Sequence, residues 1–188
     1  MLEIRWHGRG GHGIVVASHI LGEMVLTKGL YSLSIPLFGA ERRGAPVMVV
    51  TRIDEKPILK RSTETNPDVV IITDRRLMNM VDVLSGLKEK GLIVINADRI
   101  DDELAKYFKG FKVSHVDAVS ISEKHGLKVG GLPVISIPLL GAFIKATNIV
   151  DIEDGMNALR RHWGGELGEK NAIVFKEAYQ KTNVVDLT

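Results

Sequence analysis

Cysteine is absent from this chain of 188 residues. Without cysteine, the chain has no disulfide, no thiolate nucleophile and no cysteine ligand for an iron–sulfur cluster. Its six histidines form no HxxxH or HExxH pattern, which argues against a zinc site. The sequence therefore predicts neither thiol chemistry nor a metal centre on this chain.

Long apolar runs are missing as well. None approaches the roughly 18 residues that a membrane-spanning helix needs. The first residues, MLEIRW, contain no apolar core of a signal peptide. The hydrophobic share of 45% and the charged share of 26% are ordinary for a globular protein. We therefore expect a cytoplasmic protein with no membrane partner.

The chain also lacks a strong excess of either charge. Its formal net charge is +2, and residues 1–65 carry nine basic and six acidic side chains. This excess is too small for a nucleic-acid-binding surface, so we expect no nucleic-acid partner. It is compatible with a small anionic ligand near the start of the chain.

Short apolar strands alternate with amphipathic or buried helices along the sequence. The patterns predict strands at 2–7, 31–35, 68–73, 92–96 and 111–117, and helices at 12–28, 75–86, 101–107, 118–125, from about Pro138 to 147, from 152 to 163, and at 166–181. A β-hairpin is expected from 47–53 and 57–61, joined by the turn DEK. The predicted fold is α/β: a single three-layer domain over 1–188, with a mixed, mostly parallel sheet, a β-hairpin insertion and C-terminal helices.

The stretch RWHGRGGHG, residues 5–13, holds glycines at GxGxxG spacing: Gly8, Gly10 and Gly13, with Gly11 between them. A glycine turn between a strand and a helix directs amide groups and a positive helix end at one point, which suits phosphate. A dinucleotide site also needs an acid at the end of the second strand, but Glu41 lies on a loop beyond it. Spacing alone favours a tight packing turn, and leaves open a dinucleotide or another phosphate-bearing ligand.

Two groups of polar side chains accompany this turn. His7 and His12 bracket it, but no Ser/His/Asp set or carboxylate pair forms a catalytic constellation with them. Farther on, Arg42 and Arg43 lie between Glu41 and Gly44, flanked by apolar sequence. Adjacent arginines bind phosphate or anchor protein contacts, and the apolar flanks favour a contact role over a solvated loop.

Taken together, RWHGRGGHG and FGAERRGAPV resemble the gamma subunit of the 2-oxoacid:ferredoxin oxidoreductases, above all the pyruvate and 2-ketoisovalerate enzymes. The stretches DVVIIT, LIVINAD, LLGAFIKAT and EKNAIVFKEAY extend the resemblance over nearly the whole chain. His12 departs from the family pattern, which has glutamine at this position. Both side chains donate hydrogen bonds, but only histidine titrates near neutral pH.

The resemblance implies a subunit that is inactive alone and has no catalytic or metal-binding residue. Thiamine diphosphate and 4Fe-4S clusters are then expected on partner subunits of the alpha, beta and delta types, which decarboxylate the 2-oxoacid and pass electrons to ferredoxin. Coenzyme A accepts the acyl group, and this chain is expected to pack on the thiamine core and border the coenzyme A site. The cofactor-binding residues implied are Gly8, Gly10, Gly11, His12, Gly13, Arg42 and Arg43.

Pyruvate is the expected 2-oxoacid, although a close relative acting on branched-chain oxoacids would carry nearly the same subunit. Two alternatives remain open from the residues themselves. One is a free-standing NAD-dependent oxidoreductase, and the other is a structural scaffold whose glycine turn binds nothing.

Overall fold

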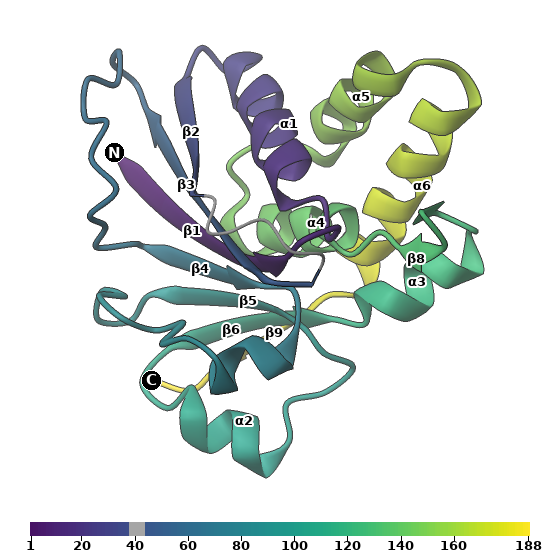
Figure 1. Ribbon diagram of the computed structural model, residues 1–188. Coiled ribbons are helices and arrows are strands. Elements are labelled where there is room, and N and C mark those ends of the chain that lie inside the picture. The colour runs from purple at the N-terminus through teal and green to yellow at the C-terminus, as the bar shows by residue number, and fades with distance from the viewer. Residues whose placement is uncertain (38–43) are drawn as a thin grey trace.

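A seven-stranded mixed sheet forms the centre of the computed structural model, which describes residues 1–37 and 44–188 (Figure 1). In spatial order the strands are β2 (Tyr31–Leu37), β3 (Pro46–Asp54), β1 (Leu2–Arg9), β4 (Val69–Ile72), β5 (Leu92–Asn96), β6 (Lys112–Val116) and β9 (Asn183–Asp186). Within this sheet, β3 and β9 run against the other strands. The expected mixed, mostly parallel sheet is confirmed.

Helices cover both faces of the sheet and make three layers (Figure 1). One face carries α1 (Ile14–Leu26), α3 (Ala118–Lys124), α4 (Ser136–Thr147), α5 (Ile152–Trp163) and α6 (Gly165–Lys181). The other face carries the short helices η1 (Arg75–Asn79) and α2 (Asp102–Tyr107). A small hairpin of β7 (Lys128–Val129) and β8 (Leu132–Pro133) follows α3.

Strand alternation divides the apolar residues between two cores. In β4, Ile71 packs into the larger core under α1 and α4, whereas Val70 and Ile72 pack into the smaller core under η1 and α2. All four residues of β4 are buried, as expected for a parallel strand covered on both faces. None of the helices in the described ranges is long and apolar enough to cross a membrane.

The hairpin predicted at 47–61 is wrong in its second half, because 57–61 is not a strand. β3 lies between β1 and β2, so neither of its edges is free to pair with the segment that follows it. That segment is held instead by Arg52, whose guanidinium donates hydrogen bonds to the carbonyl oxygens of Lys60 and Ser62. The antiparallel partners of β3 are β1 and β2.

The helix predicted at 75–86 is shortened to η1, where Asp74 caps the first turn by accepting from the backbone N–H of Arg76. Turns follow, with Asp82 accepting from the backbone N–H of Leu84 and Gly86 at a φ of 69°. Two features were not predicted: the β7–β8 hairpin, and β9, which pairs antiparallel with β6. The remaining predicted strands and helices are confirmed with ends within a few residues.

Candidate functional site

The glycine turn connects the carboxyl end of β1 to the start of α1. The N–H of His12 donates to the carbonyl oxygen of Arg9 at 2.9 Å, and Gly11, the third residue of this four-residue turn, has a φ of 97°. A positive φ at this place is typical of a type II turn and favours glycine. The N–H of Gly10 donates to the carbonyl oxygen of Ala45 at 3.0 Å, which fixes the turn to the start of β3.

The glycines of this turn differ in what a side chain would meet. A Cβ on Gly8 would lie 2.9 Å from Cγ2 of Ile14, so this glycine lets α1 pack closely against β1. A Cβ on Gly13 would lie 2.9 Å from Oγ of Ser136, at the start of α4. A Cβ on Gly11 would have no described atom within 4 Å. Gly8 and Gly13 therefore serve packing, whereas Gly11 borders open space.

Polar side chains tie the turn to the end of β4. The Nδ1 of His12 lies 2.6 Å from Oγ1 of Thr73, and the backbone N–H of Arg9 points to the same ring nitrogen at 3.4 Å. Because Nδ1 accepts from the backbone N–H of Arg9, the proton of the neutral ring lies on Nε2, and the Thr73 hydroxyl is then a donor to Nδ1. The Nε of Arg9 lies 3.3 Å from Oδ2 of Asp74.

The charges around the turn are only partly compensated. Burial lowers the pKa of the His12 imidazole; the charge of Asp74 opposes this, and those of Arg9 and Arg76 add to it. His12 therefore acts as a neutral hydrogen-bonding side chain near pH 7. Arg9 and Arg76 share the carboxylate of Asp74, and the buried Nε of Arg9 has no hydrogen-bond partner among the described residues.

The N-termini of two helices converge on a cavity beside the turn. Its volume is about 240 Å³, and Gly11, Gly13, Ser136 and Ile137 line it together with residues of α5, α6 and the β7–β8 segment. Neither α1 nor α4 has a side chain that caps its first turn. Both helices therefore direct uncapped amide groups and a partial positive charge toward the same place.

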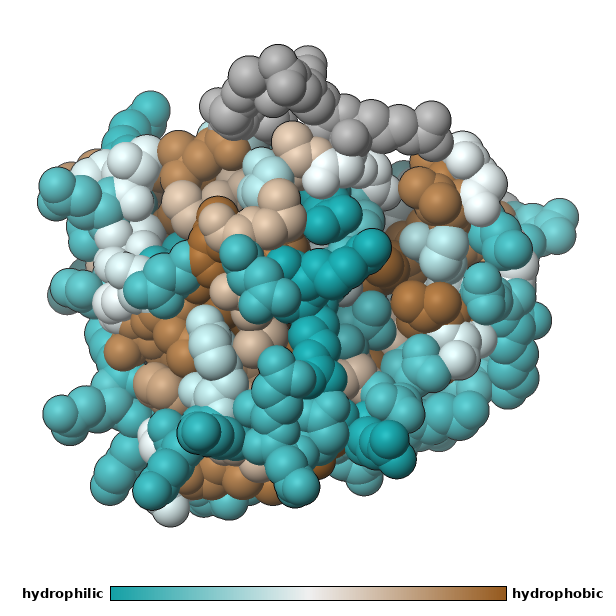
Figure 2. Space-filling view, turned by 60° about the horizontal axis from the view of Figure 1, so that its bottom comes forward, coloured by the Kyte–Doolittle hydropathy of each residue, from teal (hydrophilic) through white to brown (hydrophobic). Residues whose placement is uncertain are grey.

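The wall of this cavity is mainly apolar. Its other lining side chains are Val16, Leu127, Val129, Val134, Trp163 and Leu167, with Lys128, His12 and Asn171 as the polar members. Val16, Val129 and Leu167 are exposed, so the apolar wall continues onto the surface. On the face that Figure 2 shows, hydrophobic residues likewise gather in areas separated by a band of hydrophilic side chains.

The seven predicted site residues divide into two groups. Gly8, Gly10, Gly11, His12 and Gly13 lie together at the turn, and Gly11, His12 and Gly13 line the cavity. Arg42 and Arg43 lie outside the described residues, as does Glu41. The sequence pattern did not indicate Thr73, the last residue of the predicted strand 68–73, or Asp74, which follows it. Nothing in the sequence pointed to Ser136.

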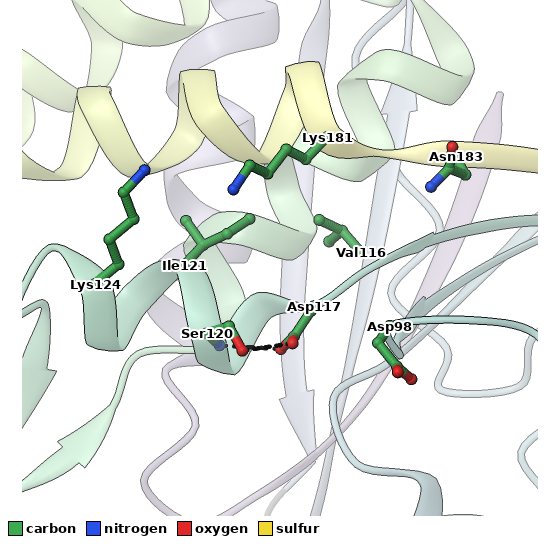
Figure 3. A pocket seen from close by; sticks show the side chains of 8 residues that line it. All are labelled: Asp98, Val116, Asp117, Ser120, Ile121, Lys124, Lys181 and Asn183. Carbon is green, nitrogen blue, oxygen red and sulfur yellow. Dashed lines mark hydrogen bonds between the residues drawn. The ribbon is translucent and has the colours of Figure 1, made fainter.

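A second, more polar cavity of about 370 Å³ lies at the ends of β5 and β6. Lys124 and Lys181 extend into the space between α3 and α6 (Figure 3) and both donate to the carboxylate of Glu177. Burial raises the pKa of Glu177, but Lys181, His125 and Lys124 more than offset this and lower it to about 2. Lys124 thus joins α3 to α6, whereas Lys181 pairs with Glu177 within α6.

Comparisons with known proteins give a consistent result. The family model described as "Pyruvate ferredoxin/flavodoxin oxidoreductase" matches residues 3–181. The "Pyruvate/ketoisovalerate oxidoreductases common subunit gamma" of Pyrococcus furiosus is 44% identical over 189 residues, which covers 100% of both chains. The crystal structure of the pyruvate oxidoreductase subunit PORC of Thermotoga maritima is similar with a TM-score of 0.83, at 30% identity over 98% of both chains.

A larger protein shares the fold at lower identity. It is a 2-oxoglutarate:ferredoxin oxidoreductase from Magnetococcus marinus, solved with 2-oxoglutarate, coenzyme A and succinyl-CoA bound. The TM-score is 0.75 at 19% identity, over 95% of this chain but 30% of the other. The fold described above thus also forms part of a longer chain.

Proposed function

This chain belongs to the pyruvate ferredoxin/flavodoxin oxidoreductase family, and from that membership we propose that it is the gamma-type subunit of a 2-oxoacid:ferredoxin oxidoreductase. The assembled enzyme converts a 2-oxoacid and coenzyme A to acyl-CoA and CO2 and passes electrons to ferredoxin. The names of the two relatives given above favour pyruvate as the 2-oxoacid. Within the complex, residues 1–188 act as one domain.

We further propose that the cavity beside the glycine turn forms part of the coenzyme A site. The observation that carries this proposal is the convergence of the uncapped N-termini of α1 and α4 on the open side of Gly11. Helix N-termini are favourable sites for phosphate groups. Coenzyme A joins phosphates to a less polar arm, and this cavity joins positive helix ends to an apolar wall.

Positively charged side chains also contribute to the proposed site. Lys128 lines the cavity, whereas Arg9 lies beside the carboxylate of Asp74. Arg42 and Arg43 complete the positive surface in this proposal, because they directly precede the segment whose Ala45 holds Gly10. When bound, coenzyme A supplies the thiol that accepts the acyl group; the residues of this chain bind and orient it.

The redox chemistry belongs to partner subunits of the alpha, beta and delta types, which hold thiamine diphosphate and the 4Fe-4S clusters and deliver electrons to ferredoxin. The lack of cysteine supports this division, because this chain has no thiolate to ligate a cluster. Val16, Val129 and Leu167 supply an exposed apolar surface for contact with a partner. We assign the complex to the cytoplasm.

Two substitutions at Gly11 test the coenzyme A site in the assembled enzyme. Asparagine and aspartate have the same size, and both adopt a positive φ more readily than other residues with a side chain. Since a Cβ at Gly11 meets no described atom within 4 Å, both variants are expected to fold. Gly11→Asp also places a negative charge at the two helix ends, and should raise the KM for coenzyme A about tenfold over Gly11→Asn.

The KM for pyruvate and the assembly of the complex should be the same in the two variants. Equal KM values for coenzyme A would refute the phosphate role of this turn. A loss of assembly in both variants would show that the turn is a docking element. Failure of the wild-type chain to co-purify with other subunits would refute the proposed function itself.

A further inference from the structure

Arg5 on β1 is a buried cation that has no carboxylate partner among residues 1–37 and 44–188. The residue is 6% exposed, and its guanidinium donates to Nε2 of His7 at 3.0 Å, to Oγ1 of Thr65 at 3.3 Å and to the carbonyl oxygen of Val83 at 2.9 Å. These three acceptors are neutral. Among the described residues, no carboxylate oxygen lies within 4.0 Å of this guanidinium.

Arg52 on the neighbouring strand has the carboxylate partner that Arg5 lacks among the described residues. Arg52 is fully buried as well, but its Nε lies 2.7 Å from the Oε2 of Glu3. Buried charges in proteins are normally paired, because an isolated charge away from water is costly. Burial lowers the pKa of Arg5, and the charges of Asp82 and Glu3, which act to raise it, do not offset this. A bound anion would therefore compensate the buried charge of Arg5.

A cavity of about 380 Å³ adjoins Arg5 on the face of the sheet opposite α1. Arg5 and His7 are its buried polar residues, and Leu37, Met48, Leu77 and Val81 are among its apolar walls. Asp82 also lines it but is exposed to solvent. The cavity thus combines one buried positive charge with apolar surface, and the exposed carboxylate of Asp82 in its lining disfavours multiply charged anions.

His7 supplies a second donor. Because Nε2 accepts from Arg5, the proton of the neutral ring lies on Nδ1. Burial and the neighbouring charge of Arg5 lower the pKa of His7 to about 3, so the ring stays neutral near pH 7. No acceptor for the Nδ1 proton is found in the described part of the chain, and His7 lines the cavity.

We propose that this cavity binds a carboxylate carried on a short apolar chain, with Arg5 and His7 holding the carboxylate and the apolar walls holding the chain. One guanidinium matches one carboxylate charge and forms two parallel hydrogen bonds with it. The carboxylate comes from a free short-chain acid or from an acidic side chain of a partner subunit. This site lies across the sheet from the cavity at Gly11 and does not depend on the coenzyme A proposal.

Isovalerate is a suitable probe, because it joins one carboxylate to a branched apolar chain. Titration into the full-length chain at neutral pH should give saturable heat in calorimetry and should shift the NMR signal of the His7 ring. The matched alcohol, 3-methyl-1-butanol, and inorganic phosphate should bind at least about tenfold more weakly. Absence of saturable isovalerate binding, or equal binding of the alcohol or of phosphate, would overturn the proposal.

Two variants locate the binding site. Arg5→Met should abolish isovalerate binding, whereas Arg75→Met should retain it, because Arg75 pairs with Asp101 elsewhere on the surface. If Arg5→Met fails to fold, Val81→Asp and Val81→Asn give the same information, since Val81 is 36% exposed at the cavity. The aspartate should weaken binding about tenfold relative to the asparagine. Equal affinities would refute the site.

The assembled complex distinguishes the two sources of the carboxylate. If the ligand is a free acid, isovalerate should bind the complex as well as the separate chain. If a partner side chain fills the cavity, isovalerate should bind the separate chain alone. Both results require that the chain itself binds isovalerate through Arg5.

Discussion

At the scale of single residues, Arg5 and Arg52 show how similar side chains take different roles. Both are buried on neighbouring strands, and both hold backbone carbonyl groups of segments outside the sheet. Arg52 is neutralised by Glu3 and holds the loop that follows β3 in place. Arg5 has neutral partners and faces a cavity. The presence of a carboxylate partner, rather than residue type or burial, distinguishes a structural arginine from one that is available to bind a ligand.

The buried imidazole of His7 makes stability depend on pH. Its pKa falls from about 6.5 in the unfolded chain to about 3 in the folded one. Between these values the unfolded state binds a proton that the native state does not. His7 therefore contributes stability above about pH 6.5, and this contribution falls by about 1.4 kcal/mol per pH unit as the pH drops toward 3.

Denaturant unfolding at pH 7.5 and pH 5.0 measures this effect. His7→Gln keeps an acceptor for Arg5 but does not titrate, so its stability should fall less over this range than that of the wild type. Glu177 loses its stabilising charge at lower pH, since its folded pKa is about 2 and its usual value is 4.5. Identical losses in His7→Gln and wild type would contradict a neutral, buried His7.

At the scale of elements, the sequence predicted those whose apolar pattern is set locally. The apolar run DVVIIT predicted the strand that became β4, and the apolar residues at helical spacing after Asp151 predicted α5. The false strand at 57–61 arose because alternation cannot reveal that both edges of β3 are already paired. The shortened helix at 75–86 likewise depends on caps and turns, which interrupt a segment whose composition still suits a helix.

For the candidate site, too, only the part formed by consecutive residues could be predicted from the sequence. The turn and its order between strand and helix are local, so its five residues could be named from the sequence. The start of α4 and the end of β4 join it through tertiary packing, so Ser136 and Thr73 could not be assigned a partner in advance. The ion pair between Arg9 and Asp74 could not be predicted either, because it also depends on tertiary packing.

Two helical glycines give a test of close packing between elements. A Cβ on Gly141 in α4 would lie 2.6 Å from the carbonyl oxygen of Phe175 in α6, and backbone does not rotate away. Alanine favours a helix over glycine by about 1 kcal/mol. The clash outweighs this gain, and Gly141→Ala should lower the free energy of unfolding by about 1–2 kcal/mol.

Gly22→Ala in α1 is the matched control. A Cβ there would lie 3.1 Å from Oγ of Ser32, which is the end of a small side chain that can turn aside. The helix preference of alanine should then prevail and leave stability unchanged or raised by up to about 1 kcal/mol. Denaturant unfolding of the two variants checks the contrast. A loss in Gly22→Ala as large as that in Gly141→Ala would show that contact distance does not set the cost.

At the scale of the whole molecule, two cavities flank the carboxyl end of β1 on opposite faces of the sheet. From β1 the chain passes through α1 toward β2 on one side, whereas β4 lies on the other side. Crevices at such points, outside the carboxyl ends of parallel strands, are common ligand sites in α/β folds. The motif RWHGRGGHG serves both cavities: Arg5 and His7 belong to one, and the glycine turn to the other.

The surface around the cavity at Gly11 leads to a prediction about assembly. Val129 is 68% exposed and Leu167 is 49% exposed, and both continue the apolar wall of that cavity. Exposed side chains contribute little to the stability of a separate chain, so Val129→Lys and Leu167→Lys should each change its free energy of unfolding by less than about 0.5 kcal/mol. In the complex, lysine would bring an unpaired charge into an apolar contact, which is unfavourable.

Both variants should therefore co-purify poorly with the partner subunits while remaining folded on their own. Leu59→Lys is the control, because Leu59 is 88% exposed in the loop after β3, near the amino end of β1, where Lys60 meets Glu3. Affinity purification of each variant with the other subunits, followed by size-exclusion chromatography, gives the fraction assembled. Normal assembly of Val129→Lys and Leu167→Lys would mean that the partner subunits contact another face, and that the apolar wall serves the ligand alone.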